Sequence, residues 1–184
     1  MSASRDIPRA WVRPARVMTE RLAHGADEKV AFVYLAVGSV LGFVAQLPAL
    51  VRTSREAAPA FEAAIQAEAG DVRAIAVPED ITDAKFEALV SGALMAWIFL
   101  VPIMLYVVAL ASHWIARALG GRGTPLRARV ALFWSFLAVT PGLLLAGLTT
   151  GLVGPGPAAA LVGTITVSAF FWIWINSLYV AETP

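Results

Sequence analysis

The residues that could carry chemistry in this chain are few, and the two histidines are the first to consider. A haem or metal site in a helical protein needs ligands from different helices at a similar depth. His24 lies six residues before the first apolar segment, whereas His113 lies near the end of the second. Because these depths do not match, we predict a surface role for His24, interfacial anchoring for His113, and no cofactor or metal.

Other catalytic chemistry has little support in the sequence. The chain has no Cys, which excludes disulfides, iron–sulfur clusters, thiolate zinc sites and thiol nucleophiles. It has no GxSxG, HExxH or Walker motif and no pair of carboxylates that could act together. Its long apolar segments contain no charged residue, whereas proton relays and ion pathways need ionisable groups within the membrane. We therefore expect neither an enzyme nor a coupled transporter or pump.

The composition is that of a membrane protein. Charged residues make up 15% of the 184 residues, compared with about 25% in soluble domains, and hydrophobic residues make up 59%. The net charge of +1 gives no support to a nucleic-acid partner. The first uncharged segment, 30–51, has 22 residues. As a helix it would be about 33 Å long, which matches a hydrocarbon core of about 30 Å.

The last uncharged segment, 130–181, predicts two crossings. Its 52 residues are too many for one span, and the Gly-Pro-Gly-Pro sequence at 154–157 is a turn signal. The chain is therefore predicted to be an all-α polytopic membrane bundle with transmembrane helices at 30–51, 88–116, 130–152 and 158–180. Pro102 and Pro141 should each kink their span, and the second kink should leave carbonyl groups for Ser or Thr hydroxyls or neighbouring helices to satisfy.

The basic residues predict the orientation of these spans. Residues 1–29 carry six Lys or Arg and the basic loop 117–129 carries four, whereas the segment 52–87 carries four and the turn 154–157 none. Because cytoplasmic loops are enriched in Lys and Arg, we predict that both termini lie in the cytoplasm and that the protein spans a bacterial inner membrane. Aromatic residues near span ends on the same side are Trp114, Trp134, Trp172, Trp174 and Tyr179.

Residues 1–29 are predicted to form a cytoplasmic amphipathic arm. Ile7, Trp11, Met18 and Leu22 recur at intervals of four and seven residues, and Pro14 is expected to begin the helix. The arm either lies in the anionic headgroup layer or packs on its own bundle. In the first alternative the basic residues that contact anionic lipid are Arg9, Arg13, Arg16 and Arg21.

The segment 52–87 is predicted to be external, acidic and partly helical. It holds eight acidic and four basic residues, a net charge of −4. Thr53 and Glu56 have the spacing of a capping box, which predicts a new helix that Gly70 can stop. A further helix should start near Thr82 and run into the second span. The segment is either a docking surface for an external partner or a solvated face.

Small and polar residues predict how the spans meet. Gly38 with Gly42 and Gly147 with Gly151 form two GxxxG pairs that allow close helix packing, within the bundle or by self-association. Uncharged polar residues in the spans are expected to hydrogen-bond between helices, with a substrate path as the alternative. These residues are Gln46, Ser91, Ser135, Thr140, Thr149, Thr150, Thr164, Thr166, Ser168 and Asn176.

The order of short motifs resembles a known family. The segment RPARVM at 13–18 precedes the first span, and SHWIARAL at 112–119 is followed by GGRGT at 120–124 and by Pro141 in the next span. This order is similar to that in bacterial proteins with a Yip (Ypt-interacting protein) domain. The resemblance implies a small membrane helix bundle, usually drawn with five spans, whereas this chain predicts four. Eukaryotic relatives bind Rab-type GTPases in vesicle traffic, and bacterial relatives share no established activity.

The matching residues imply structural roles. They are Pro14, Gly120, Gly121, Gly123 and Pro141. Glycine lets the cytoplasmic loop turn with positive φ, and Thr124 followed by Pro125 suits a helix start.

The sequence therefore predicts a non-enzymatic membrane protein of Yip-domain type. Its expected role is to organise or scaffold membrane components, in one version as an accessory subunit of a larger complex. The expected partners are the lipid bilayer and another membrane protein or a second copy. The alternative is a small transporter or channel for an uncharged or weakly polar solute.

Overall fold

Four long helices form the body of the protein. In a computed structural model of the chain, residues 3–25, 27–56 and 81–183 are described. The long helices are α3 (Glu28–Arg55), the continuous α5 (Ile81–Met95), η1 (Ala96–Leu100) and α6 (Val101–Ala118), the pair α7 (Pro125–Ala138) and α8 (Thr140–Leu152), and α9 (Pro157–Glu182). All four are long and apolar enough to cross a membrane. The predicted all-α bundle with four transmembrane helices is therefore confirmed.

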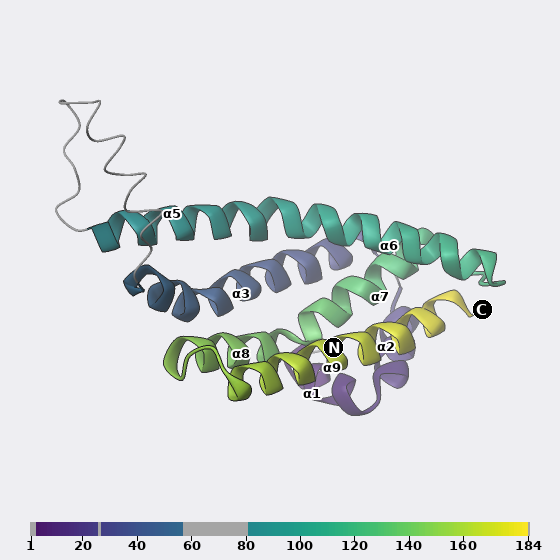
Figure 1. Cartoon of the computed structure of the whole chain (residues 1–184). Helices are drawn as coiled ribbons and strands as arrows, with labels where there is room; N and C mark the ends of the chain where they lie inside the picture. Colours follow the sequence, from purple (N-terminus) through teal and green to yellow (C-terminus); the bar gives the residue numbers. More distant parts are fainter. Residues whose placement is uncertain (1–2, 26, 57–80, 184) are drawn as a thin grey trace, which may run out of the picture.

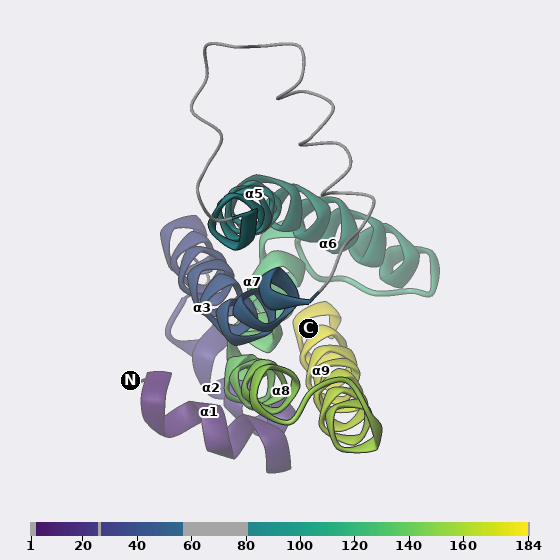
Figure 2. The ribbon, with the colours of Figure 1, turned by 60° about the vertical axis from the view of Figure 1, so that its left-hand side comes forward.

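Two short helices, α1 (Ala3–Val12) and α2 (Pro14–Ala23), pack on one flank of this bundle (Figures 1 and 2). Figure 2, which looks more nearly along the long helices, shows α1 below α8. The start of α3 and the end of α9 lie at the same end of the bundle (Figure 1). We call this the basic end, because the arginine-rich arm and the α6–α7 loop lie there.

Local sequence explains most helix ends. The Asp27 carboxylate accepts a hydrogen bond from the N–H of Lys29 at 3.1 Å, and the Thr124 hydroxyl accepts one from the N–H of Arg127 at 3.4 Å. Pro125 and Pro157 occupy first helical positions, where a missing N–H is tolerated. Gly154 turns the chain after α8 with a φ of +100°.

The observed boundaries correct three expectations. The capping-box prediction at Thr53 is wrong, because α3 continues through Thr53 to Arg55. The rest of the helix that was predicted to start at Thr53 and stop at Gly70 lies outside the described residues. Much of the basic loop 117–129 is helical, since α7 already begins at Pro125. Helix α1 precedes Pro14, so the arm contains two helices rather than one.

Helix α7 is the core of the bundle. Every residue from Val130 to Thr140 is buried, and Phe133 and Trp134 are fully enclosed. This helix lies between α3, α6 and α9 (Figure 2). Trp134, which was predicted to be one of the aromatic residues near the span ends, is therefore a core residue. Of the others, Trp114, Trp172 and Tyr179 are exposed.

The glycines of the third span allow α8 to lie against the backbone of α3. A Cβ atom on Gly147 would lie 1.7 Å from the carbonyl oxygen of Ala45, and one on Gly151 would lie 2.4 Å from Pro48 Cβ. No side chain larger than hydrogen fits at this distance.

The glycines of the first span serve a different purpose. A Cβ atom on Gly38 would lie 2.7 Å from the Phe136 ring, and one on Gly42 would lie 2.0 Å from the Trp97 ring. These two rings stack on each other with centroids 6.3 Å apart. Gly38 and Gly42 thus make room for aromatic side chains within the bundle.

The third span bends at Val139, where α7 gives way to α8 (Figure 1). Pro141 has no N–H, so the carbonyl of Leu137 loses its usual helical partner. The Thr140 hydroxyl donates to this carbonyl at 2.9 Å. In the second span, Pro102 is the second residue after the π-helical turn η1.

Candidate functional site: buried polar groups at the basic end

Ionisable side chains that are buried gather mainly at the basic end of the bundle. The side chains of Asp6, Arg21, His113 and Glu182 are at most 7% exposed. A buried charge is costly unless an opposite charge and hydrogen bonds compensate it. Each of these groups has such a partner: Arg21 pairs with Asp6 of the preceding helix, and Glu182 pairs with His113, 69 residues earlier.

Glu182, at the end of α9, is held by two other segments. His113 Nδ1 in α6 lies 2.7 Å from one carboxylate oxygen, and the backbone N–H of Gly123 donates to the other at 3.1 Å. The N–H of Arg122 donates to the main-chain carbonyl of Glu182 at 2.8 Å. When the carboxylate is ionised it only accepts hydrogen bonds, and the His113 ring then donates from Nδ1. Glu182 therefore ties α6, the α6–α7 loop and α9 together.

The glycines of this loop explain how the carboxylate fits. A Cβ atom on Gly123 would lie 2.3 Å from the carbonyl oxygen of Ala181, and one on Gly121 would lie 2.9 Å from that of Ala116. Gly120 turns the chain with a φ of +96°. The three loop glycines thus let the backbone approach Glu182 closely, which is a structural role.

Arg21 of α2 lies within the bundle rather than at its surface. Its guanidinium pairs with Asp6 at 2.8 Å, donates to the Tyr34 hydroxyl, and stacks over the Trp134 ring at 3.4 Å from the centroid. These contacts join α1, α2, α3 and α7. Because its guanidinium is buried in these contacts, Arg21 is not available to a lipid phosphate. The other three arginines that were predicted to contact lipid, Arg9, Arg13 and Arg16, are exposed.

The remaining arginines of the arm are exposed. Arg9 and Arg16 pair with Glu20 at 3.0 and 3.1 Å, and Arg13 lies at the bend between α1 and α2. The hydrogen bond from Arg16, together with that from Arg9, lowers the pKa of Glu20 below its ordinary value. Glu20 is therefore ionised at neutral pH.

The N-terminal arm packs on its own bundle, which is the second of the two predicted alternatives. Val17 and Met18 are fully buried, and the Trp11 indole donates to the Ala138 carbonyl at 2.9 Å, next to the bend of the third span. Both Trp11 and the Thr140 hydroxyl thus satisfy carbonyls around Pro141.

A further pair closes the basic end. Arg129 of α7 pairs with Glu28 of α3 at 2.7 Å, and the Tyr106 hydroxyl lies 3.4 Å from the same Glu28 oxygen. This pair is half-exposed, so salt screens it and it contributes about 0–1 kcal/mol.

A comparison of the chain with known protein families, with curated proteins and with solved structures finds no match.

The two histidines do not meet. His24 is exposed and its Nδ1 lies 2.6 Å from the Glu20 carbonyl of its own helix, whereas His113 is bound to Glu182. Among the described residues, no three His, Cys, Asp or Glu side chains are placed to share a metal ion.

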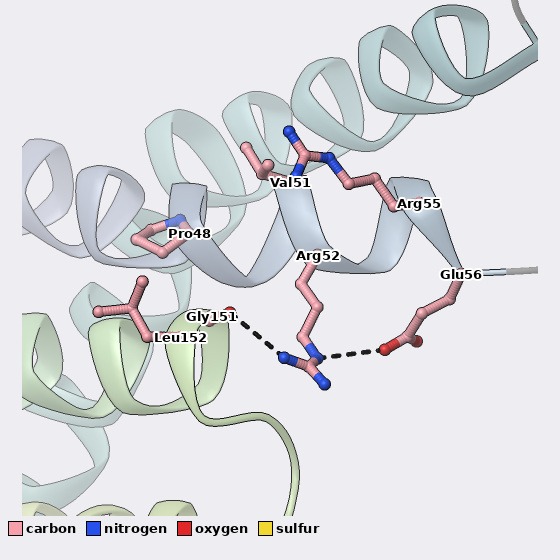
Figure 3. Close-up of a pocket in the computed structure, with 7 residues that line it drawn as sticks. All are labelled: Pro48, Val51, Arg52, Arg55, Glu56, Gly151 and Leu152. Atoms are coloured by element: carbon pink, nitrogen blue, oxygen red, sulfur yellow. Dashed lines mark hydrogen bonds and ion pairs between the residues drawn. The ribbon is translucent and has the colours of Figure 1, made fainter.

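The opposite end of the bundle carries a smaller polar cluster. Figure 3 shows the Arg52 guanidinium of α3 between the Gly151 carbonyl of α8, at 3.5 Å, and the Glu56 carboxylate, at 3.4 Å. Arg55 points away from Arg52 on the other side of α3 (Figure 3). Lys85 of α5 donates to the Glu56 carbonyl, so this cluster joins α3, α5 and α8.

Sequence reasoning missed the carboxylates that organise the basic end, Asp6, Glu28 and Glu182. A signal for one of them exists, because Glu182 is the only Asp or Glu after Glu87. No comparable signal singles out Asp6 or Glu28.

Proposed function

We propose that this protein is a non-enzymatic scaffold of Yip-domain type in a bacterial inner membrane, where it organises other membrane components or acts as an accessory subunit of a larger complex. Both termini lie in the cytoplasm in this proposal, since the basic end is the arginine-rich one. The observation that carries it is that most of the uncharged polar side chains predicted within the spans hydrogen-bond to their own helices.

The polar side chains in the spans bond to their own helices. Seven of the ten donate to a carbonyl three or four residues earlier: Ser135, Thr140, Thr149, Thr150, Thr164, Thr166 and Asn176. The expectation that they hydrogen-bond between helices is wrong for these seven. A hydroxyl or amide bonded in this way has a hydrogen-bond partner within its own helix and does not need a solute as a partner. This pattern supports a packing role and lends no support to the transporter alternative.

The outer faces of two spans support an interaction role. In the apolar stretch of the second span, 6% of the residues are buried, and in that of α9, 11% are buried. The corresponding share is 67% in the third span. Large side chains such as Phe99, Ile103 and Ile175 point outward from these helices. Such faces suit acyl chains and partner helices alike.

The residues of the family resemblance have structural roles here, which fits a scaffold. Gly121 and Gly123 receive Glu182, Pro14 begins α2, and Pro141 bends the third span. None of them touches a group arranged for catalysis among the described residues.

Site-specific photocrosslinking in intact cells tests the proposal. A benzophenone side chain is placed in turn at Ile103 of α6, at Ile175 of α9 and, as a buried control, at Leu35 of α3. A scaffold should give a discrete protein adduct from one exposed face and none from Leu35. The partner found in that adduct should also co-migrate with the protein on native gels of mild-detergent extracts. Lipid adducts alone, with migration as a small free species, would contradict the proposal.

A further inference from the structure

Two grooves meet on the surface of the N-terminal arm. The first, of about 430 Å³, follows the bend between α1 and α2 and is lined by Pro8, Arg9, Val12, Arg13, Arg16 and Val17. The second, of about 650 Å³, separates α1 from α8 and is lined by Ile7, Pro8, Trp11, Pro141, Gly142 and Leu145. Pro8 borders both, so a basic groove continues into an apolar one.

Both grooves face the leaflet nearer the basic end. Ala138, which Trp11 contacts, is 14 residues before Leu152. This distance along a helix is about 21 Å, in a hydrocarbon core of about 30 Å. Leu145, in α8, lies about 10 Å further along the same span. The apolar groove therefore leads from the arginines toward the centre of the membrane, as an acyl chain does.

The charges of the basic groove fit an anion. Two carboxylates, Asp6 and Glu20, face four arginines here: Arg9, Arg13, Arg16 and the buried Arg21. Arg9 pairs with both carboxylates, Arg16 with Glu20, and Arg21 with Asp6. Two positive charges therefore remain uncompensated. The side chain of Arg13 forms no hydrogen bond or ion pair with the described residues, and its guanidinium is free to bind phosphate oxygens through two parallel hydrogen bonds.

We propose that the two grooves form a binding site for one anionic phospholipid, with its phosphate at Arg13 and neighbouring arginines and one acyl chain between Trp11 and Leu145. This site differs from general adsorption of a basic helix to a charged surface, because it requires the apolar groove as well. It goes beyond the scaffold role and does not depend on it, since a lipid can be bound whether or not a protein partner exists.

Native mass spectrometry of the full chain in a mild detergent tests the site. The protein is titrated separately with phosphatidylglycerol and phosphatidylcholine of the same chain length. The wild type should retain one phosphatidylglycerol per chain, about thirtyfold more tightly than phosphatidylcholine. Inorganic phosphate at the same concentration should not displace the lipid, because it has no acyl chain. Equal retention of the two lipids, or displacement by phosphate alone, would overturn the proposal.

Two variants separate the grooves, each with a matched control. Arg13→Glu should weaken the binding of phosphatidylglycerol about tenfold or more and leave that of phosphatidylcholine unchanged. Arg122→Glu changes another exposed arginine at the same end and should have no effect. Leu145→Trp narrows the apolar groove and should weaken both lipids, whereas Leu148→Trp, outside the groove on the same helix, should not.

Each comparison can fail. Equal losses for Arg13→Glu and Arg122→Glu would indicate diffuse attraction rather than a site, and unchanged retention in Leu145→Trp would remove the acyl groove. Melting curves of each variant show whether the fold is intact. A negative result here leaves the photocrosslinking result for the scaffold role unaffected, so the two proposals fail separately.

Discussion

Glu182 shows how one side chain can hold the basic end of this bundle together. Its carboxylate takes hydrogen bonds from His113 and from the Gly123 backbone, and both lose their partner if it is removed. Breaking a buried, hydrogen-bonded pair leaves polar groups without water or partner, which typically costs several kcal/mol.

Replacement of this carboxylate should therefore destabilise the protein. We expect Glu182→Ala to lower the free energy of unfolding by about 3 kcal/mol and Glu182→Gln to lower it less, because the amide oxygen can still accept from Gly123. Denaturation in mixed detergent, followed by circular dichroism, measures the difference. Glu87→Ala, at an exposed position of α5, is the control and should stay within about 0.5 kcal/mol of the wild type. A Glu182→Ala variant as stable as this control would show that the pair contributes nothing.

Single residues were the hardest feature to predict from the sequence. Glu182 stands out as the last acidic residue, yet its partner His113 is 69 residues away and only the fold brings them together. His113 was predicted to be an interfacial anchor on the basis of its position near a span end. Its burial follows from the approach of α9, which periodicity does not reveal.

At the scale of elements, the approach of α8 to α3 depends on glycine. The Gly147 Cα lies so close to the Ala45 carbonyl that an added methyl group would overlap backbone, which cannot move aside as a flexible side chain can.

Gly147→Ala should consequently separate the two helices and lower the free energy of unfolding by about 2 kcal/mol or more. Gly163→Ala in α9, where an added Cβ meets nothing within 4 Å, is the matched control. It should be neutral or stabilising by about 0.5–1 kcal/mol, because alanine favours a helix more than glycine does. The same denaturation assay compares the two variants. Equal stabilities would mean that α3 and α8 are not closely packed.

Elements were predictable where local chemistry defines them. Thr124 and Pro125 start α7, and Pro141 lies at the start of α8, as residue types alone suggest. The Thr53 capping box failed because α3 gains more from continuing beside α5 and α8 than from a new start. Helix α1 escaped prediction because Pro8 lies inside it, and its helical form depends on packing against α7 and α9.

At the scale of the whole molecule, the uncharged segments were enough to predict the fold class. A backbone within lipid must satisfy its own hydrogen bonds, so long apolar segments become helices and their number sets the topology. The location of the buried ion pairs was not predictable in this way, because they join side chains from four helices, α1 with α2 and α6 with α9. The segment 57–80, which holds most of the acidic residues of 52–87, is outside the described residues.

The topology leads to a prediction that the lack of Cys makes simple to test, because single-cysteine variants have no background. The α8–α9 turn and the α6–α7 loop lie at opposite ends of the bundle (Figure 1). Since the arginines gather at the second of these, we expect a cysteine at Pro155 to react with a membrane-impermeant maleimide in intact cells. A cysteine at Gly120 or Thr183 should react only after the membrane is permeabilised, and one at the buried Leu35 in neither case. Labelling of Thr183→Cys in intact cells would show that the orientation is opposite to the predicted one. It would also place Arg13 and the lipid groove in the outer leaflet, so the same experiment determines from which leaflet the anionic lipid must come.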